Sequence, residues 1–282
     1  MLARRAPTEP WRDPSPEIVN GDLADQAALG RLCAGAEVLI HSAGLVKARG
    51  RADFDAVNVA GARRVAVAAL EAGVSRVVLV SSLTAREPGL SHYSASKAAG
   101  EVAMREVLGR ALTIARPCAI YGPGDRELLP VFQAAAASPV LPLLGAPARV
   151  AMIHVADAAG QVAALAATRR NGGSVVALCD SRPDGYSWRE LMAEAARACG
   201  RTPRFVPVPT ALIRAIGITN DFTALFGATP MLTSAKAREL LHPNWAVAPE
   251  EQTEAVRPAR YDLRTGFSTT VAWYRSAEWM KH

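Results

Sequence analysis

Short apolar runs alternate with longer segments of helical spacing along the first two thirds of the chain. The run 75–82, "SRVVLVSS", is almost continuously apolar, which is typical of a parallel strand covered on both faces. The segment 54–73 has helical spacing and closes on Gly73. The same criteria predict further strands at 17–23, 36–44, 112–122, 149–155 and 174–180, and helices at 25–35, 93–108, 130–137, 187–199 and from Asp157. Strands and helices alternating at this size predict an α/β fold with a doubly wound parallel sheet.

The regular alternation weakens after about residue 125. From there the chain is richer in proline and short helices, and it contains no internal repeat and no low-complexity linker. We expect two regions: residues 1–124 as the main sheet domain, and residues 125–282 as a smaller C-terminal substrate lobe interleaved with the last strands of the sheet.

Composition excludes several classes of protein. The net charge is +6, but the arginines are scattered and are not interleaved with aromatic residues, so we expect no nucleic-acid partner. No apolar stretch approaches the length of a membrane span and no secretory signal opens the chain, which predicts a cytoplasmic protein without a membrane partner. The cysteines lack metal-ligand spacing, so reduced, mostly buried thiols and no metal site are expected at Cys33, Cys118, Cys179 and Cys199.

Candidate chemistry lies in "HYSASKAAGE" (92–101). On a helix Tyr93 and Lys97 share one face, and a nearby ammonium lowers the pKa of a phenol toward the working range of a proton donor. Ser82 ends the preceding strand, where open α/β sheets bind ligands. These three residues are the predicted catalytic unit: Ser82 orients an oxygen, Tyr93 exchanges the proton and Lys97 modulates it. The plainer alternative is a helix with one buried ring and one solvated amine.

Ordered motifs along most of the chain resemble one family. "GDLAD" (21–25), "VLIHSAG" (38–44), "NVAGARRVAVAA" (58–69), "YSASK" (93–97), "RPCAIYGPGD" (116–125) and "MIHVADAA" (152–159) are similar in sequence and order to the extended short-chain dehydrogenase/reductases, the NAD-dependent epimerase/dehydratase family. The resemblance implies a Rossmann-like fold, a dinucleotide cofactor and a small-molecule substrate.

The resemblance also implies roles for single residues. Cofactor contacts would come from Arg4, Asp22, Leu23, Ala43, Gly44, Lys97 and Pro117, and substrate contacts from Thr84, Tyr121 and Arg149, with Arg116 on the same side as Tyr121. Plainer alternatives are that Asp22 caps a helix, that Gly44 is a turn glycine, and that Arg149 forms a surface salt bridge. Asn58 would be a structural link between a strand and a helix, and His154 would be a core histidine with its hydrogen bonds satisfied.

One expected segment is missing from the motif series. The family opens with a strand, a GxxGxxG turn and a helix, whose backbone approaches a pyrophosphate, and no segment here fits it. The chain is therefore expected to be N-terminally truncated by roughly 30 residues, either through a mis-called start or as a genuine short product. Without that strand, 36–44 would have an unpaired edge, and 17–23 would be orphaned or paired in a way foreign to the family.

Three functions remain open. The leading prediction is an NAD- or NADP-dependent oxidoreductase acting on a hydroxyl or carbonyl carbon, with Arg4 favouring NADP. A nucleotide-sugar epimerase would use the same residues, and a catalytically silent binding or scaffold protein would explain the missing glycine turn. A dehydratase fits less well because Leu83 and Thr84, instead of an Asp-Glu pair, follow Ser82. By analogy with the family, helices 54–71 and 93–108 would form a homodimer.

Overall fold

The computed structural model describes residues 1–4, 16–48, 50–144, 148–168, 172–224 and 232–280. These residues divide into two compact units, each formed by two stretches of the chain. Unit 1 comprises Met1–Arg116 and Val162–Val176, and unit 2 comprises Pro117–Gln161 and Ala177–His282. The boundary expected near residue 124 thus corresponds to a first crossing after Arg116, and the chain returns to unit 1 once more.

A parallel sheet organises unit 1. Its strands follow the order β10-β5-β4-β3, and the neighbours β3, β4 and β5 run parallel. The strands of this sheet are β3 (Val38–His41), β4 (Arg76–Val80), β5 (Leu112–Pro117) and β10 (Val175–Leu178), the last two continuing into unit 2. An α/β fold with parallel strands is therefore confirmed.

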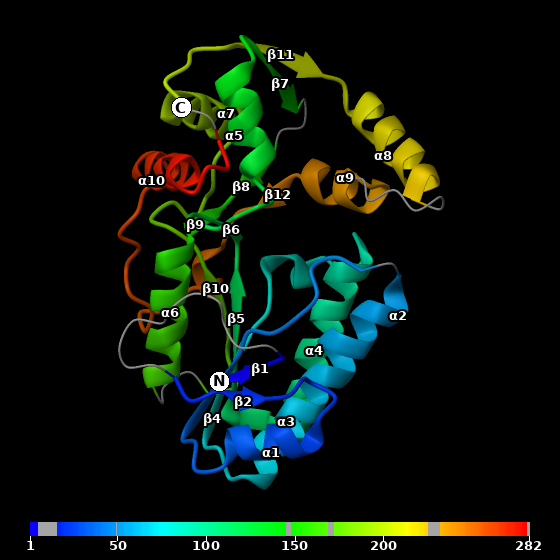
Figure 1. The fold of residues 1–282 in the computed structure, drawn as a ribbon, viewed down its shortest axis with the longest axis vertical. Coiled ribbons are helices and arrows are strands. Elements are labelled where there is room, and N and C mark those ends of the chain that lie inside the picture. The colour runs from blue at the N-terminus through cyan, green and yellow to red at the C-terminus, as the bar shows by residue number, and fades with distance from the viewer. Residues whose placement is uncertain (5–15, 49, 145–147, 169–171, 225–231, 281–282) are drawn as a thin grey trace. The chain divides into compact units, whose positions relative to one another are not determined.

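Helices and a buried core support the sheet on one face. They are α1 (Gln26–Cys33), α2 (Arg51–Phe54), the π-helical turn η1 (Asp55–Gly61), α3 (Ala62–Glu71), the 3-10 turn η2 (Leu83–Arg86), α4 (His92–Leu108) and η3 (Gly109–Ala111). Helix α3 packs between α1 and α4 (Figure 1). The side chains of Leu39, Val77, Ile114, Val65 and Met104 belong to one buried apolar cluster, which joins strands to helices and provides most of the stabilisation expected from burial.

Strand β3 forms an edge of the sheet, as expected for 36–44 when the opening strand of the motif series is missing. Strand β3 has β4 as its neighbour and stands at the end of the four-stranded sheet in the described chain. Strand β2 (Val19–Asn20) instead pairs in parallel with β1 (Leu2–Ala3), and the two form a separate sheet. The strand predicted over 17–23 is thus reduced to two residues, because its partner offers only two.

Unit 2 contains three small parallel sheets and several helices. Strand β6 (Ala119–Tyr121) pairs with β9 (Met152–His154), β7 (Val140–Leu144) with β11 (Arg204–Val208), and β8 (Arg149–Val150) with β12 (Asn244–Trp245). The helices are α5 (Leu129–Ala137), α7 (Trp188–Ala198), α8 (Thr210–Ala224), α9 (Ser234–Leu241), the 3-10 turn η4 (Pro249–Glu251) and α10 (Leu263–Ser276), and α6 (Val155–Ala167) runs from unit 2 into unit 1.

Two further expectations concern composition. All four cysteines are buried and carry free thiols, as predicted. Among the described helices, none combines the length and the hydropathy that crossing a membrane requires.

Candidate active site

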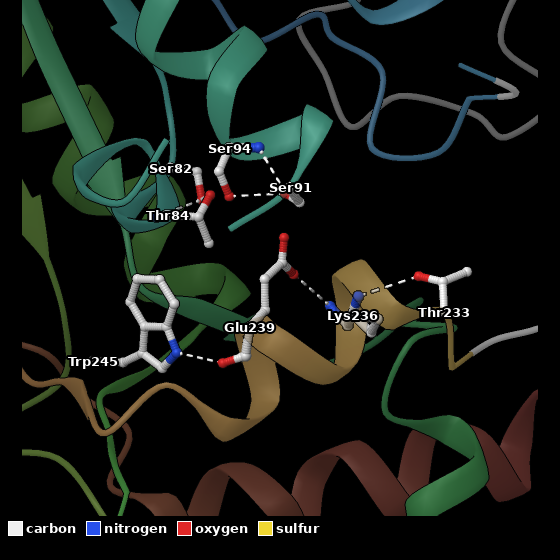
Figure 2. A network of polar contacts seen from close by, with 8 residues as sticks. All are labelled: Ser82, Thr84, Ser91, Ser94, Thr233, Lys236, Glu239 and Trp245. Carbon is white, nitrogen blue, oxygen red and sulfur yellow. Dashed lines mark hydrogen bonds and ion pairs between the residues drawn. The ribbon is translucent and has the colours of Figure 1, made fainter. Parts of the chain in front are cut away.

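Ser82 and Thr84 form a small hydroxyl pair just after β4. Strand alternation turns Ser81 inward and leaves Ser82 half-buried at the start of η2. Thr84 donates to Ser82 Oγ from its Oγ1 at 3.0 Å and from its backbone N–H at 3.3 Å. Figure 2 shows the two hydroxyls directed toward each other. The contact fixes the Ser82 side chain and leaves its own proton available for another acceptor.

Tyr93 lies in the first turn of α4. The helix begins at Ser91, whose hydroxyl accepts the N–H of Ser94 at 2.9 Å (Figure 2). The half-buried Tyr93 ring lies 6.1 Å from the Phe54 ring, centroid to centroid, at an angle of 54°.

Lys97, on the next turn of α4, extends its side chain toward the end of β4. Its Nζ donates to the backbone carbonyl of Val80, at the carboxyl end of β4, at 2.9 Å. Burial lowers the pKa of Lys97 to about 8, an effect that the negative charge of Glu101 partly offsets. The pKa of the nearby His41 imidazole is lowered to about 4. The larger cause is the burial of His41 itself, and the smaller is the positive charge of Lys97. His41 is therefore neutral near pH 7.

Glu101, which the sequence analysis did not identify, holds a buried polar cluster one turn beyond Lys97. Its side chain is 7% exposed and accepts two hydrogen bonds from Arg116, at 2.9 and 2.6 Å, and a third from Ser81 Oγ at 2.5 Å. Arg116, expected beside the substrate, thus binds a carboxylate within unit 1. The spacing Tyr93, Lys97, Glu101, with four residues at each step, was the available signal, since it places all three on one helical face.

Asn58 connects the loop after β3 to α4. Its Oδ1 accepts the N–H of Leu45 at 2.8 Å, and its Nδ2 donates to Leu45 O at 3.0 Å and to Ser96 Oγ at 2.9 Å. These contacts agree with such a structural link. They also hold Gly44 so close that a Cβ there would lie 3.0 Å from Asn58 Oδ1 and 3.9 Å from Lys97 Nζ.

The exposed backbone at Ala43 and Gly44 fits a flat cofactor ring. Position 44 has little room for a side chain toward Asn58 and Lys97, and both Ala43 and Gly44 are exposed. Glycine at such a position allows a ligand to approach the backbone closely. The residues of this loop and Lys97 are therefore compatible with a bound dinucleotide.

The other predicted cofactor residues differ in exposure: two are exposed and two pack against other side chains or are buried. Arg4 is exposed directly after β1, and Asp22 is exposed with its Oδ1 accepting the N–H of Ala24 at 2.8 Å. Asp25, and not Asp22, caps α1, so the helix-cap alternative for Asp22 is wrong. Leu23 packs on the core, 3.1 Å from where a Cβ at Gly61 would stand, and Pro117 is buried at the end of β5.

Two predicted substrate residues belong to unit 2. Tyr121 is fully buried, its hydroxyl donates to Asp262 O at 3.4 Å, and burial raises its pKa far above the usual range. This environment indicates that Tyr121 packs in the core of unit 2. Arg149 is exposed and lies 3.7 Å from Glu190 Oε2, which agrees with the surface salt bridge. Neither placement tests a role with substrate, which stays a prediction.

His154 of unit 2 differs from its predicted state. Its Nδ1 accepts the N–H of Ala156 at 3.2 Å, but its Nε2 is buried without a hydrogen-bond partner among the described residues. The ring stacks on Tyr261 at 4.0 Å and meets the edge of Tyr121 at 5.5 Å. Aromatic carbon surrounds the imidazole, so the expectation of a fully satisfied histidine is wrong for Nε2.

Unit 1 thus carries three groups of kinds that can take part in proton exchange. The Ser82 hydroxyl follows β4, the Lys97 amine donates to the Val80 carbonyl at the end of β4, and the Tyr93 phenol lies in the first turn of α4. Such groups can hold an oxygen atom, exchange its proton and stabilise the charge that results.

Comparison with known proteins adds independent findings. A family model described as the NAD dependent epimerase/dehydratase family matches residues 1–178. A protein of Caulobacter vibrioides (strain NA1000 / CB15N) named ceramide reductase is 50% identical over 282 residues, covering 99% of this chain and 87% of its own length.

Solved structures share the fold at lower identity. The crystal structure of gox2253 has a TM-score of 0.74 at 20% identity and covers 94% of this chain and 86% of its own. MoeE5 in complex with UDP-glucose and NAD has a TM-score of 0.72 at 20% identity and covers 98% and 90%. At this identity the likeness establishes the fold alone.

Proposed function

This chain belongs to the NAD-dependent epimerase/dehydratase family of enzymes, and on that premise we propose that it is a reductase of a carbonyl group in a ceramide-type lipid. The observation that carries the proposal is the 50% identity to a ceramide reductase over 99% of the chain. That similarity includes unit 2 as well as the cofactor motifs, so it extends to the region expected to bind the substrate.

The geometry of unit 1 supports the following proposed roles. A bound nicotinamide would supply the hydride. Tyr93 gives its proton to the carbonyl oxygen as that oxygen becomes a hydroxyl, and Ser82 donates a hydrogen bond that orients the oxygen beforehand. Lys97, held by the Val80 carbonyl, stabilises the charge left on Tyr93 and binds the cofactor ribose. Thr84 fixes Ser82 in position.

The cofactor contacts are proposed for the residues that the motifs indicate. Ala43 and Gly44 offer open backbone, and the exposed Asp22 carboxylate suits a polar group of the adenosine half. Arg4, exposed after β1, supports the use of NADP, because a guanidinium suits a 2′-phosphate. Leu23 and Pro117 would contribute apolar contacts.

The test follows the cofactor in the presence of two kinds of substrate. NADH or NADPH is incubated with the ketone obtained by oxidising one ceramide hydroxyl, and separately with UDP-glucose. Net loss of reduced cofactor with the lipid ketone supports the reductase. Conversion of UDP-glucose to its epimer without net change in cofactor would establish the epimerase instead.

A silent protein is distinguished by binding alone. If neither dinucleotide binds, both enzymatic functions are excluded for this chain and a binding role replaces them. A protein that binds NADPH but reduces no lipid ketone would keep its family chemistry and lose the substrate proposed here.

A further inference from the structure

Helix α8 in unit 2 presents its apolar side outward. Leu212, Ile216 and Ile218 are 51%, 40% and 65% exposed, whereas Ile213 and Gly217 are buried. At 3.6 residues per turn, the part of α8 from Thr210 to Asp221 has one continuous arc of about 160° that contains only apolar residues and one threonine. In order around the helix, this arc consists of Ile218, Ala211, Ala215, Thr219, Leu212 and Ile216, all exposed. We call the three large residues, Leu212, Ile216 and Ile218, the α8 face.

Two polar side chains of α8, those of Asn220 and Asp221, are used for internal contacts. Asn220 Nδ2 donates to Leu232 O at 2.9 Å, and Asp221 accepts the N–H of Ser234 at 3.1 Å and its hydroxyl as well. A Cβ at Gly217 would lie 3.0 Å from Ser234 Cα, so α8 approaches the start of α9 closely (Figure 1). A helix that faces water normally has the opposite orientation, with its polar residues outside.

Helix α9, against which α8 is held, is itself well anchored. Thr233 caps it by accepting the N–H of Lys236 at 3.1 Å, and the indole of Trp245 donates to Glu239 O at 2.8 Å (Figure 2). The outward orientation of the α8 face is therefore fixed by several hydrogen bonds. Strand β11, which leads into α8, adds the half-exposed Val206.

The chain segment that contains the α8 face carries mostly positive charge. From residue 200 to residue 233 the chain contains three arginines and a single acid, Asp221, which is bound to Ser234. Arg201, Arg204 and Arg214 are all exposed. An apolar face on a segment with exposed cations, of which Arg214 is on α8 itself, complements an interface that is apolar beneath a layer of negative charge. A second copy docked symmetrically would bring two segments of the same charge together.

We propose that the α8 face docks this protein on the surface of membranes that contain anionic phospholipids. The inference extends the proposed function in one respect, since a ceramide-type substrate resides in membranes. The expectation of no membrane partner came from the lack of a spanning segment, and a helix lying in the interface needs none.

The test measures binding of the full chain to lipid vesicles by co-sedimentation. Vesicles of phosphatidylcholine are compared with vesicles that also contain phosphatidylglycerol, at low and high salt. We expect binding to the anionic vesicles that weakens with salt. The double variant Leu212→Ser with Ile216→Ser should bind at least about tenfold less well, because two side chains no longer enter the interface.

Two further variants complete the design. Val102→Ser changes a valine on α4 that is 58% exposed, outside the α8 face, and should bind like the parent protein. Arg204→Gln with Arg214→Gln should remove most of the preference for anionic vesicles. Unfolding midpoints of all variants are compared, since surface changes of this kind should leave them nearly unchanged.

Several outcomes would overturn the proposal. They are failure of the parent protein to bind either vesicle, binding that is unchanged in the double variant, or self-association that the double variant abolishes while vesicles are not bound. Turnover of a water-soluble ketone is measured separately. Vesicle binding without turnover would overturn the proposed function alone, and turnover without vesicle binding would overturn the docking alone.

Discussion

Replacing Glu101 by glutamine probes the buried cluster beneath Lys97. The carboxylate holds Arg116 through two hydrogen bonds, and the side chains of the pair are 7% and 19% exposed. Glutamine has nearly the same shape and can still accept one of these bonds. Its substitution therefore removes the negative charge that pairs with Arg116.

The expected cost follows from the burial of the pair. Removing one partner of a buried ion pair destabilises a protein by about 3–5 kcal/mol, because the other charge stays desolvated. The same helix offers a matched control in Glu106, whose partner Arg63 lies at 3.3 Å with both side chains more than half exposed. Exposed pairs contribute about 0–1 kcal/mol, so Glu106→Gln should change stability little.

The assay is urea unfolding of the two variants and the parent protein. We expect Glu101→Gln to lose about 3 kcal/mol and Glu106→Gln less than about 1 kcal/mol. Adding Arg116→Met to Glu101→Gln should restore part of the loss, since the guanidinium that pairs with Glu101 is then absent as well. Equal stability of the two single variants would refute the reasoning. Activity gives a second readout: Glu101 raises the pKa of Lys97, so its loss should move the alkaline limb of kcat/KM to lower pH.

Three other predictions address the site and the assembly. Lys97 has a pKa of about 8 in the folded protein and its usual 10.5 in the unfolded chain, so the folded state binds fewer protons between these pH values. The free energy of unfolding of the parent protein should therefore rise relative to that of Lys97→Met as pH increases from about 8 to 10.5. A difference between the two proteins that does not change over this range would contradict the prediction. Gly44→Ala should weaken NADH and NADPH binding in titration calorimetry, because its Cβ would press on Asn58. Gly50→Ala is the control, since a Cβ there meets nothing within 4 Å. Equal dinucleotide affinities of the two variants would exclude the contact between this loop and the cofactor. If the helices at 54–71 and 93–108 pair in a homodimer, Leu70→Glu should shift the sedimentation profile to the monomer. A parent protein already monomeric would remove that expectation.

The sequence predicted best where one short pattern determined one element. The apolar run at 75–82 became β4, and the segment 93–108 became α4 with Tyr93 and Lys97 on adjacent turns. Both depend on local periodicity, which needs no knowledge of distant residues. The roles assigned to Ser82, Tyr93 and Lys97 remain predictions.

Long-range pairings were missed. Strands β7 and β11 pair across sixty residues and contain Pro142 and Pro207, and proline inside a strand argues against that assignment. Glu101 escaped notice because a glutamate on a helix is ordinarily solvated. Only the approach of Arg116 from β5 shows that it is buried and bound. The π-helical turn η1, which directs Asn58 toward Leu45 and Ser96, has no sequence pattern of its own.

The most direct test of the account is turnover by Tyr93→Phe, measured with reduced dinucleotide and the ceramide-derived ketone. Phenylalanine keeps the ring beside Phe54 and removes only the hydroxyl. We expect kcat to fall by roughly 10²–10⁴-fold, the usual contribution of a general acid, while the affinity for the dinucleotide stays the same. Undiminished kcat in this variant would contradict the assignment of Tyr93 as the proton donor.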